Sequence, residues 1–191
     1  MDMYLNSKKP KYKKFFKSMF WWIFEIALVI LAAWLIIEYA VEKTTMMGVS
    51  MNTTLNDGDK IIINKMSYFR KDPKRNDVIV FSQSKSGHGY YNIKRVVGLP
   101  GETIEIVNGE VYINGVKIQE VIPVEKMRVA GLADEAIVLG ENEFFVLGDN
   151  RNYSEDSRFA NIGIVVRNDI IGKAWMRLEP FSIIDKINRE D

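Results

Sequence analysis

A serine and a lysine that lie far apart in the sequence are the residues best suited to perform chemistry together in this chain. Ser50 lies in the segment Gly48-Val-Ser-Met-Asn-Thr-Thr-Leu55, and Lys94 has the apolar neighbours Ile93 and Val96. A serine hydroxyl becomes a strong nucleophile when a positioned base takes its proton, and a lysine amine can be that base when burial lowers its pKa. Because the two residues are distant in sequence, only tertiary folding can bring them together.

Histidine is the usual base for a serine nucleophile, and the chain contains one, His88. It lies between glycines in the polar segment Ser84-Lys-Ser-Gly-His-Gly89, without an acidic neighbour. A pairing with a distant Asp stays open, but nothing nearby has the pattern of a catalytic triad, so we interpret His88 as an exposed loop residue. A reaction catalysed by serine and lysine requires no metal and no cofactor, and we expect neither.

A third segment, Gly148-Asp-Asn-Arg-Asn-Tyr-Ser-Glu-Asp-Ser-Arg158, is rich in polar and charged side chains. It follows the apolar run Glu143-Phe-Phe-Val-Leu147, which predicts a strand, so its first residues are interpreted as a polar turn. An arginine and a carboxylate can form two parallel hydrogen bonds, a geometry that suits a rigid supporting role.

These segments, with Lys94-Arg-Val-Val-Gly-Leu-Pro-Gly-Glu102 between them, resemble the sequence boxes of the type I signal peptidases, in the family's order. Members of that family are membrane-anchored serine proteases with a Ser/Lys dyad. The resemblance implies that Ser50 is the nucleophile and Lys94 the general base. It also implies a set of supporting residues: Ser154 to orient the lysine amine, Asp156 and Arg158 as an ion pair, and Asp149 and Arg151 as structural support.

The resemblance further implies a substrate class. The expected substrates are secretory preproteins, whose signal peptides are removed by a cut after small residues at positions −1 and −3. We expect the substrate to lie extended beside the strand that carries Lys94, with main-chain hydrogen bonds. The expected partners are these preproteins, the lipid bilayer and the secretion translocon, and not nucleic acid. Candidate substrate-binding residues are the apolar neighbours of the motifs: Met46, Met51, Leu55 and Ile93.

The chain departs from the family pattern at two positions of the first segment. Thr53 stands where proline is usual, and because proline fixes φ near −65° we expect a less rigid loop. Gly48 stands where some members have a serine that donates to the oxyanion. The backbone N–H of Ser50 is therefore the expected oxyanion donor, and a second donor is not evident.

The N-terminal region has the pattern of a membrane anchor. Six lysines precede the apolar run from Phe20 to Ile37, which only Glu25 interrupts. The residues from Met19 to Tyr39 match a hydrocarbon core of roughly 30 Å at about 1.5 Å per residue. A cleavable secretory signal is the alternative, but its apolar part is usually about 7–15 residues, shorter than this run. We therefore predict a basic segment at 1–18 and a transmembrane helix at 19–40.

The distribution of lysines predicts the orientation of that helix. Lysines are concentrated before the apolar run and only Lys43 follows closely, so the N-terminus is expected in the cytoplasm and residues 41–191 outside the plasma membrane. The chain has no cysteine and a formal net charge of +1. The near-neutral charge gives no sign of a nucleic-acid-binding protein.

Short β-branched and aromatic runs separated by turn residues predict that the exported part is mostly β. Asn108-Gly109 between two alternating runs is a strong hairpin signal, and the stretch 120–139 is the least regular. The resemblance implies a curved, antiparallel, partly barrel-like catalytic domain with a smaller strand subdomain at about 103–143. The predicted strands are Lys60–Asn64, Asp77–Phe81, Thr103–Val107, Val111–Ile113, Glu143–Leu147 and Gly172–Arg177.

Three other interpretations are weaker. A related class of peptidase has histidine in place of the lysine, and Lys94 argues against it. A self-cleaving repressor shares the serine and lysine chemistry, but the apolar anchor and the lack of a DNA-binding segment disfavour it. A membrane-anchored β domain that only binds a partner is the alternative from a different functional class, and the complete set of Ser50, Lys94 and Ser154 disfavours it.

Overall fold

The structure is a computed structural model that describes residues 11–82 and 91–187. Residues 1–10 of the predicted basic segment and the loop with His88 lie outside the described residues. The chain forms two compact units that divide between Tyr39 and Ala40, and each is described by itself.

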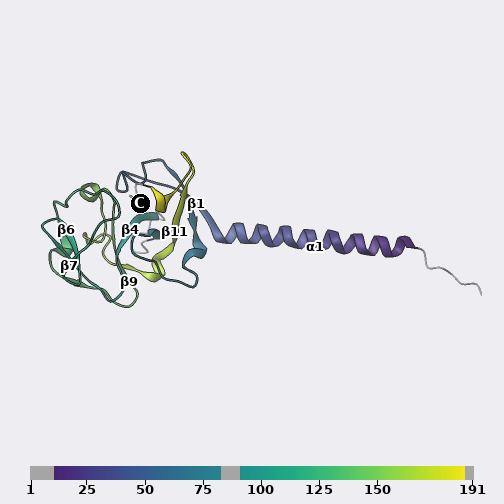
Figure 1. Cartoon of the computed structure of the whole chain (residues 1–191), viewed down its shortest axis with the longest axis horizontal. Coiled ribbons are helices and arrows are strands. Elements are labelled where there is room, and N and C mark those ends of the chain that lie inside the picture. Colours follow the sequence, from purple (N-terminus) through teal and green to yellow (C-terminus); the bar gives the residue numbers. More distant parts are fainter. Residues whose placement is uncertain (1–10, 83–90, 188–191) are drawn as a thin grey trace, which may run out of the picture. The chain divides into compact units, whose positions relative to one another are not determined.

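The first unit contains the long helix α1 (Lys11–Ala40) except for its last residue (Figure 1). Its part from Lys14 to Ala40 has a mean hydropathy of 2.4 in its most apolar window, and none of that window is buried inside the protein. At about 1.5 Å per residue this part is roughly 40 Å long, enough to cross a bilayer. The helix begins before the predicted residue 19, because the lysines that precede the apolar run are good helix formers.

The larger sheet of the second unit has eight strands, and every pairing in it is antiparallel. Seven of them follow the order β1-β2-β11-β3-β4-β9-β10, and β12 pairs with β11. The strands are β1 (Val41–Thr45), β2 (Lys60–Asn64), β3 (Val78–Ser82), β4 (Tyr91–Gly98), β9 (Glu143–Leu147), β10 (Val165–Val166), β11 (Ile170–Arg177) and β12 (Ser182–Ile183).

This sheet is strongly curved. Register shifts interrupt the pairing of β11 with β2 and β3 and that of β4 with β9, and such bulges bend a strand. The Tyr91 hydroxyl on β4 donates to the Glu42 carboxylate on β1 at 2.7 Å, although β1 and β4 are four places apart in the strand order. The sheet therefore curls until its first strand approaches its fifth.

A second, four-stranded sheet has the order β7-β6-β5-β8. Figure 1 shows its β6 and β7 on the opposite side of the domain from β1 and β11. Asn108 and Gly109 join two of its strands with φ of 52° and 77°, the left-handed values that the predicted hairpin requires. The strands are β5 (Thr103–Val107), β6 (Glu110–Ile113), β7 (Val116–Lys117) and β8 (Ile137–Val138).

Short 3₁₀ helices occupy several connections: η1 (Lys65–Tyr68), η3 (Gly131–Asp134), η4 (Arg151–Tyr153), η5 (Arg167–Asp169) and η6 (Ile184–Lys186). Alternating strand residues bury one or both faces of the sheets in three apolar clusters. The predicted fold class is confirmed: the protein is mostly β, with one N-terminal apolar helix and a curled antiparallel sheet. The six predicted strands all form, and β2, β5 and β9 have the predicted bounds.

Candidate active site

Ser50 lies in the loop that joins β1 to β2. Main-chain bonds close this loop, since Met46 N donates to Asp59 O at 2.8 Å and Gly58 N donates to Met46 O at 2.9 Å. Gly48 has a φ of 80°, and its N–H donates to the Asp57 carboxylate at 2.7 Å. This left-handed backbone is the conformation that glycine adopts without strain, so any side chain at position 48 would be strained there.

Thr53 also has a left-handed backbone, with a φ of 92°. Such a value is unusual for a β-branched residue, and the ring of proline excludes it because it fixes φ near −65°. The difference from the usual proline is therefore one of backbone conformation, and not only of rigidity. Local strain of this kind tends to occur at functional sites, where the surrounding structure holds it in place.

Lys94 projects from β4 toward the serine. Its Nζ lies 2.7 Å from Ser50 Oγ, and its side chain is buried, with 5% of the residue exposed. Burial lowers the pKa of Lys94 below its usual 10.5, and the charges of Asp156, Glu155 and Asp149 oppose this shift more weakly. Within residues 11–82 and 91–187 no carboxylate lies within ion-pair distance of Lys94. The arrangement can therefore supply a neutral amine to a serine hydroxyl.

The third segment packs directly on the serine loop. Asn150 N donates to Ser50 O at 3.1 Å, and Asn150 Nδ2 donates to Val49 O at 3.0 Å. At Gly148 an added Cβ would overlap Ser154 and would lie 2.5 Å from Ser50 O. The absence of a side chain at Gly148 is therefore what lets the end of β9 approach the serine so closely.

Ser154 lies in this contact, with 8% of the residue exposed. Its Oγ is buried and has no hydrogen-bond partner among the residues that the structure describes. The hydrogen bond expected between Ser154 and Lys94 is thus not formed in this state, and an orienting role for Ser154 stays a prediction.

Asp156 and Arg158 form a buried, bidentate ion pair. Arg158 donates from Nε to Asp156 Oδ1 at 2.7 Å and from Nη2 to Oδ2 at 2.9 Å. Arg158 also donates to the carbonyls of Arg151 and Val129, and Asp156 accepts from Gly148 N at 3.1 Å. The pair therefore connects the end of β9 with η4. It also holds the irregular stretch 120–139 against the third segment through the hydrogen bond to Val129 O.

Sequence reasoning missed a second charged network, centred on Arg95. This arginine is 3% exposed, and it donates from Nε and Nη2 to the two carboxylate oxygens of Asp149 at 2.7 and 2.6 Å. The Thr54 hydroxyl donates to the same carboxylate at 2.5 Å. One residue from each of the three segments thus meets in one buried cluster. The signal was the adjacency of Lys94 and Arg95, because neighbouring strand residues point to opposite faces.

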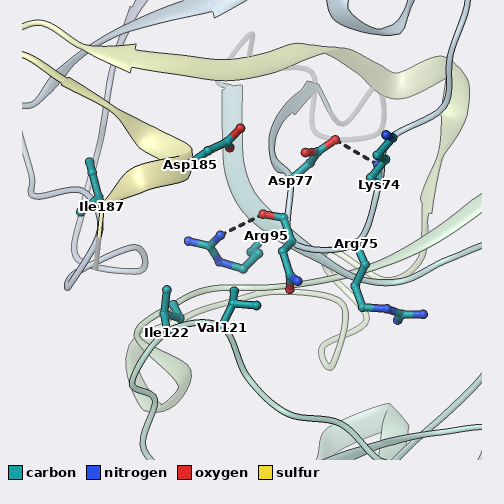
Figure 2. A pocket seen from close by; sticks show the side chains of 9 residues that line it. Lys74, Arg75, Asp77, Arg95, Val121, Ile122, Asp185 and Ile187 are labelled. Atoms are coloured by element: carbon teal, nitrogen blue, oxygen red, sulfur yellow. Dashed lines mark hydrogen bonds between the residues drawn. The ribbon is translucent and has the colours of Figure 1, made fainter. Parts of the chain in front are cut away.

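A cavity lies beside Arg95, whose Nη1 donates to Asn76 O at 2.9 Å (Figure 2). Neither Ser50 nor Lys94 lines it. Its two carboxylates are already paired, since Lys173 lies 2.6 Å from both Asp77 and Asp185. This cavity is therefore separate from the serine and lysine pair. The other lining residues are Lys74, Arg75, Val121, Ile122 and Ile187.

The four candidate substrate-binding residues all lie in one apolar core cluster: Met46, Met51, Leu55 and Ile93. At most 4% of each is exposed, so their contact with a substrate stays a prediction. Met47 and Val49, which precede the serine, are 68% and 47% exposed. They are the apolar side chains of this loop that a ligand can reach directly.

Two strand edges beside Ser50 have unused main-chain groups. Among residues 11–82 and 91–187, β1 is the end strand of the sheet, and β9 pairs with β4 only from Arg95 onward, so no described strand pairs with Tyr91–Lys94 on that side. The Tyr91–Glu42 contact joins β4 to β1, and the Lys94–Ser50 contact joins β4 to the loop that follows β1. An extended peptide can add to such an edge through main-chain hydrogen bonds. Across residues 11–82 and 91–187 the structure has no cluster of three or more potential metal-ligating His, Cys, Asp or Glu side chains.

Comparison with known proteins gives consistent matches. The family model described as "Signal peptidase, peptidase S26" matches residues 19–179. The "Signal peptidase I" of Bacillus licheniformis is 29% identical over 189 residues, which cover 95% of this chain and 99% of that protein. The "Signal peptidase IB" of Staphylococcus aureus is 29% identical over 181 residues, 87% of this chain and 92% of that protein. A signal peptidase I structure from Enterococcus faecalis is 31% identical, with a TM-score of 0.41, and covers 54% of this chain and 97% of its own.

Proposed function

This chain belongs to the signal peptidase family, peptidase S26, whose members are serine peptidases that remove signal peptides, and we propose that it cleaves them with a Ser50–Lys94 dyad. The observation that carries the proposal is the 2.7 Å separation between Lys94 Nζ and Ser50 Oγ, together with the burial of the lysine. Burial lowers the pKa of Lys94 and so favours the neutral amine, which is the form that can accept a proton.

The proposed reaction is an acyl transfer in two halves. Neutral Lys94 takes the hydroxyl proton while Ser50 Oγ attacks the carbonyl carbon of the scissile peptide bond, and the protonated amine then gives that proton to the leaving nitrogen. In the second half Lys94 takes a proton from water, the resulting hydroxide attacks the acyl-enzyme ester, and Ser50 Oγ leaves with the proton returned from the lysine.

The developing negative charge on the carbonyl oxygen requires hydrogen-bond donors. The backbone N–H of Ser50 is the proposed donor, and the loop contacts from Asn150 to Ser50 and Val49 support its orientation. Two buried ion pairs have the proposed role of fixing the third segment against the serine loop: Asp156 with Arg158, and Asp149 with Arg95. Ser154 is the proposed positioning residue for the amine during the reaction.

The proposed substrate is the signal peptide region of a secretory preprotein, bound extended along the Tyr91–Lys94 edge of β4, which no described strand covers on that side. A cut after small residues at −1 and −3 fits a site whose nearby apolar side chains, Met51 and Ile93, are already closely packed and leave little room for bulk. The secretion translocon is a further proposed partner.

The proposed location is the plasma membrane, with α1 as a single anchor, the N-terminus in the cytoplasm and residues from 41 onward outside. The apolar helix and the excess of lysine before it support this orientation. Protease added to intact spheroplasts should then digest the region after Tyr39 and leave a small N-terminal fragment. A β domain protected from that digestion would mean the opposite orientation.

The test of the dyad is cleavage of a preprotein by the full chain in detergent, sized on a gel. Ser50→Ala and Lys94→Ala should each abolish cleavage, and the double variant should be no worse, because residues that act as a unit are not additive. Lys117→Ala, which changes an exposed lysine of β7, is the matched control and should remain active. Turnover by Ser50→Ala at the same bond, or binding without any cleavage by the unaltered chain, would refute the proposal; the second result would favour the binding-module alternative.

A further inference from the structure

Residues 125–128 lie against the hairpin turn of the four-stranded sheet, and we call them the bridging stretch. Met127 N donates to Gly109 O at 3.0 Å, and Met127 is buried in an apolar cluster with residues of β5 and β6. Gly109 belongs to the turn between β5 and β6, where its φ of 77° is left-handed. A Cβ at position 109 would lie only 2.5 Å from Met127 O. The turn and the bridging stretch are therefore in direct backbone contact.

Asn152 of the third segment contacts the same stretch through its side chain. Its Nδ2 donates to Lys126 O and to the Glu125 carboxylate, both at 3.1 Å. Its Oδ1 accepts from Arg128 N at 2.9 Å. A carboxamide carries donors and an acceptor, so one side chain can bond main-chain groups on both sides of Met127. Residues 125–128 form neither helix nor strand, and these contacts are therefore what fixes them against the third segment.

Asn150 lies two residues before Asn152 and contacts the serine loop instead. It is the N-cap of η4, which contains Asn152, and Tyr153 N donates to Asn150 O at 3.0 Å. Asn150 N donates to Ser50 O at 3.1 Å, and Asn150 Nδ2 donates to Val49 O at 3.0 Å. Contacts therefore run from the hairpin turn of the small sheet through the bridging stretch and η4 to the loop that carries the nucleophile.

We propose that Asn152 is a positioning residue for the nucleophile, and that the small sheet acts through it to fix where Ser50 lies. The proposal rests on the proposed Ser50–Lys94 dyad. Transfer of the hydroxyl proton depends on the 2.7 Å contact between Ser50 Oγ and Lys94 Nζ. A displacement of about 1 Å that originates far from the chemistry can cost about 10²-fold in rate. The small sheet thus contributes to catalysis without touching the reacting atoms.

Two glycine variants test the role of the small sheet. Gly109 and Gly115 each follow an asparagine in a hairpin turn of this sheet, and both have a φ of 77°, so alanine is strained at both. A Cβ at position 115 meets nothing within 4 Å, whereas one at position 109 overlaps Met127 O. We expect Gly109→Ala to have a kcat about tenfold below that of Gly115→Ala, with KM changed less than about twofold. The assay is preprotein cleavage by the full chain in detergent, at a temperature where circular dichroism shows each variant folded.

The Asn152 variants test the same contact without a change in the turn. Asn152→Ala should lower kcat by about tenfold, and adding Gly109→Ala should lower it no further, because both changes break the same connection. Asn152→Asp places a second carboxylate beside Glu125, and Glu125→Gln then supplies a donor again. We expect Asn152→Asp to lose about tenfold in kcat, and the pair Asn152→Asp with Glu125→Gln to regain at least about threefold. Glu125→Gln alone keeps an acceptor for Asn152 and should cleave at the unaltered rate.

The outcomes separate this proposal from the proposed dyad. Equal kcat values for Gly109→Ala and Gly115→Ala would overturn the role of the small sheet, and an unaltered kcat for Asn152→Ala would overturn the role of Asn152. With Ser50→Ala inactive, both results would leave the dyad intact. A double variant slowed by the product of the two single losses would mean that the small sheet does not act through Asn152. Turnover by Ser50→Ala at the same bond would refute the dyad, and the positioning proposal with it.

Discussion

Lys94 and Arg95 are neighbouring basic residues on β4, and their side chains meet different groups on the two faces of the strand. Both are almost fully buried, with 5% and 3% of each residue exposed. Arg95 faces the carboxylate of Asp149 at 2.6 Å, whereas Lys94 faces the hydroxyl of Ser50 at 2.7 Å. A buried charge that is paired and hydrogen-bonded persists, and a buried amine without a carboxylate partner tends to lose its proton.

The comparison shows that burial alone does not decide the protonation of a basic side chain. The same strand supplies a permanent cation that links the serine loop to the third segment and, one residue earlier, an amine whose pKa is lowered. The choice of side chain matters as well, because a guanidinium cannot be deprotonated in a protein and an ammonium can. One face is therefore suited to structure and the other to proton transfer.

The largest expected effect comes from giving the lysine face a permanent charge. Lys94→Arg keeps a cation beside Ser50 but cannot accept the hydroxyl proton, so we expect cleavage to fall by about 10⁴-fold or more. Preprotein cleavage under single-turnover conditions measures this loss, and circular dichroism checks that the domain is folded. Activity within tenfold of the unaltered protein would mean that Lys94 is not the base.

The next effect concerns the arginine face. Asp149→Ala leaves Arg95 as an unpaired buried cation, and we expect a loss of about 3–5 kcal/mol in the free energy of unfolding. Arg95→Met combined with Asp149→Leu should recover most of that loss, because the burial of an unpaired charge is then removed. Urea unfolding followed by fluorescence gives both values. A change below about 1 kcal/mol for Asp149→Ala would show that this pair does not hold the segments together.

The pH dependence should also distinguish the two faces. The base must be a neutral amine, so kcat/KM should rise with pH, about tenfold per unit below the lowered pKa of Lys94, and level off above it. The folded pKa is depressed, so the unfolded chain binds more protons between that value and 10.5, and the stability of the fold should rise with pH across this window. Lys94→Met should lose this rise, whereas the Arg95 and Asp149 variants should keep it. A flat activity profile from weakly acidic to weakly alkaline pH would point to another base.

The smallest effect is expected at Ser154, whose buried hydroxyl is unpaired among the residues that the structure describes. Removing an unsatisfied polar atom costs little, so Ser154→Ala should keep or slightly increase the stability of the fold, within about 1 kcal/mol. If the hydroxyl binds the amine during the reaction, the same variant should lower kcat and shift the pH limb, and Ser154→Thr should restore part of the activity. If neither kcat nor the pH range over which activity rises were changed, Ser154 would have a packing role alone.

Local sequence patterns predicted much of the fold. The β-branched run of β2, the alternating residues of β5 and the apolar run of β9 formed strands at the predicted positions. Asn108-Gly109 formed the predicted turn because both residues accept positive φ. Short strands such as β8 and β10 were not predicted, because two residues give too little pattern and their pairing depends on distant neighbours.

The site was less accessible to local reasoning. Ser50 and Lys94 were singled out by chemistry and by family resemblance, but no spacing rule brings them within 2.7 Å. The cluster of Thr54, Arg95 and Asp149 depends on which strand faces meet, and that is a property of the curled sheet. The left-handed φ of Thr53 was also unforeseeable, since β-branched residues disfavour that conformation and only the surrounding loop imposes it.

Gly148 limits the position of Ser50 by steric contact and not by a hydrogen bond. Hydrogen bonds such as that from Asn150 N to Ser50 O can lengthen by a few tenths of an ångström at a modest cost in free energy. The close approach of Gly148 to Ser50 O and Ser154 does not allow such adjustment, because an atom added to Gly148 would overlap both residues. A single methyl group at this position would push the nucleophile out of alignment while the dyad itself stays chemically intact. The accuracy of the site is thus limited in one direction by atomic size, which temperature and solvent hardly change.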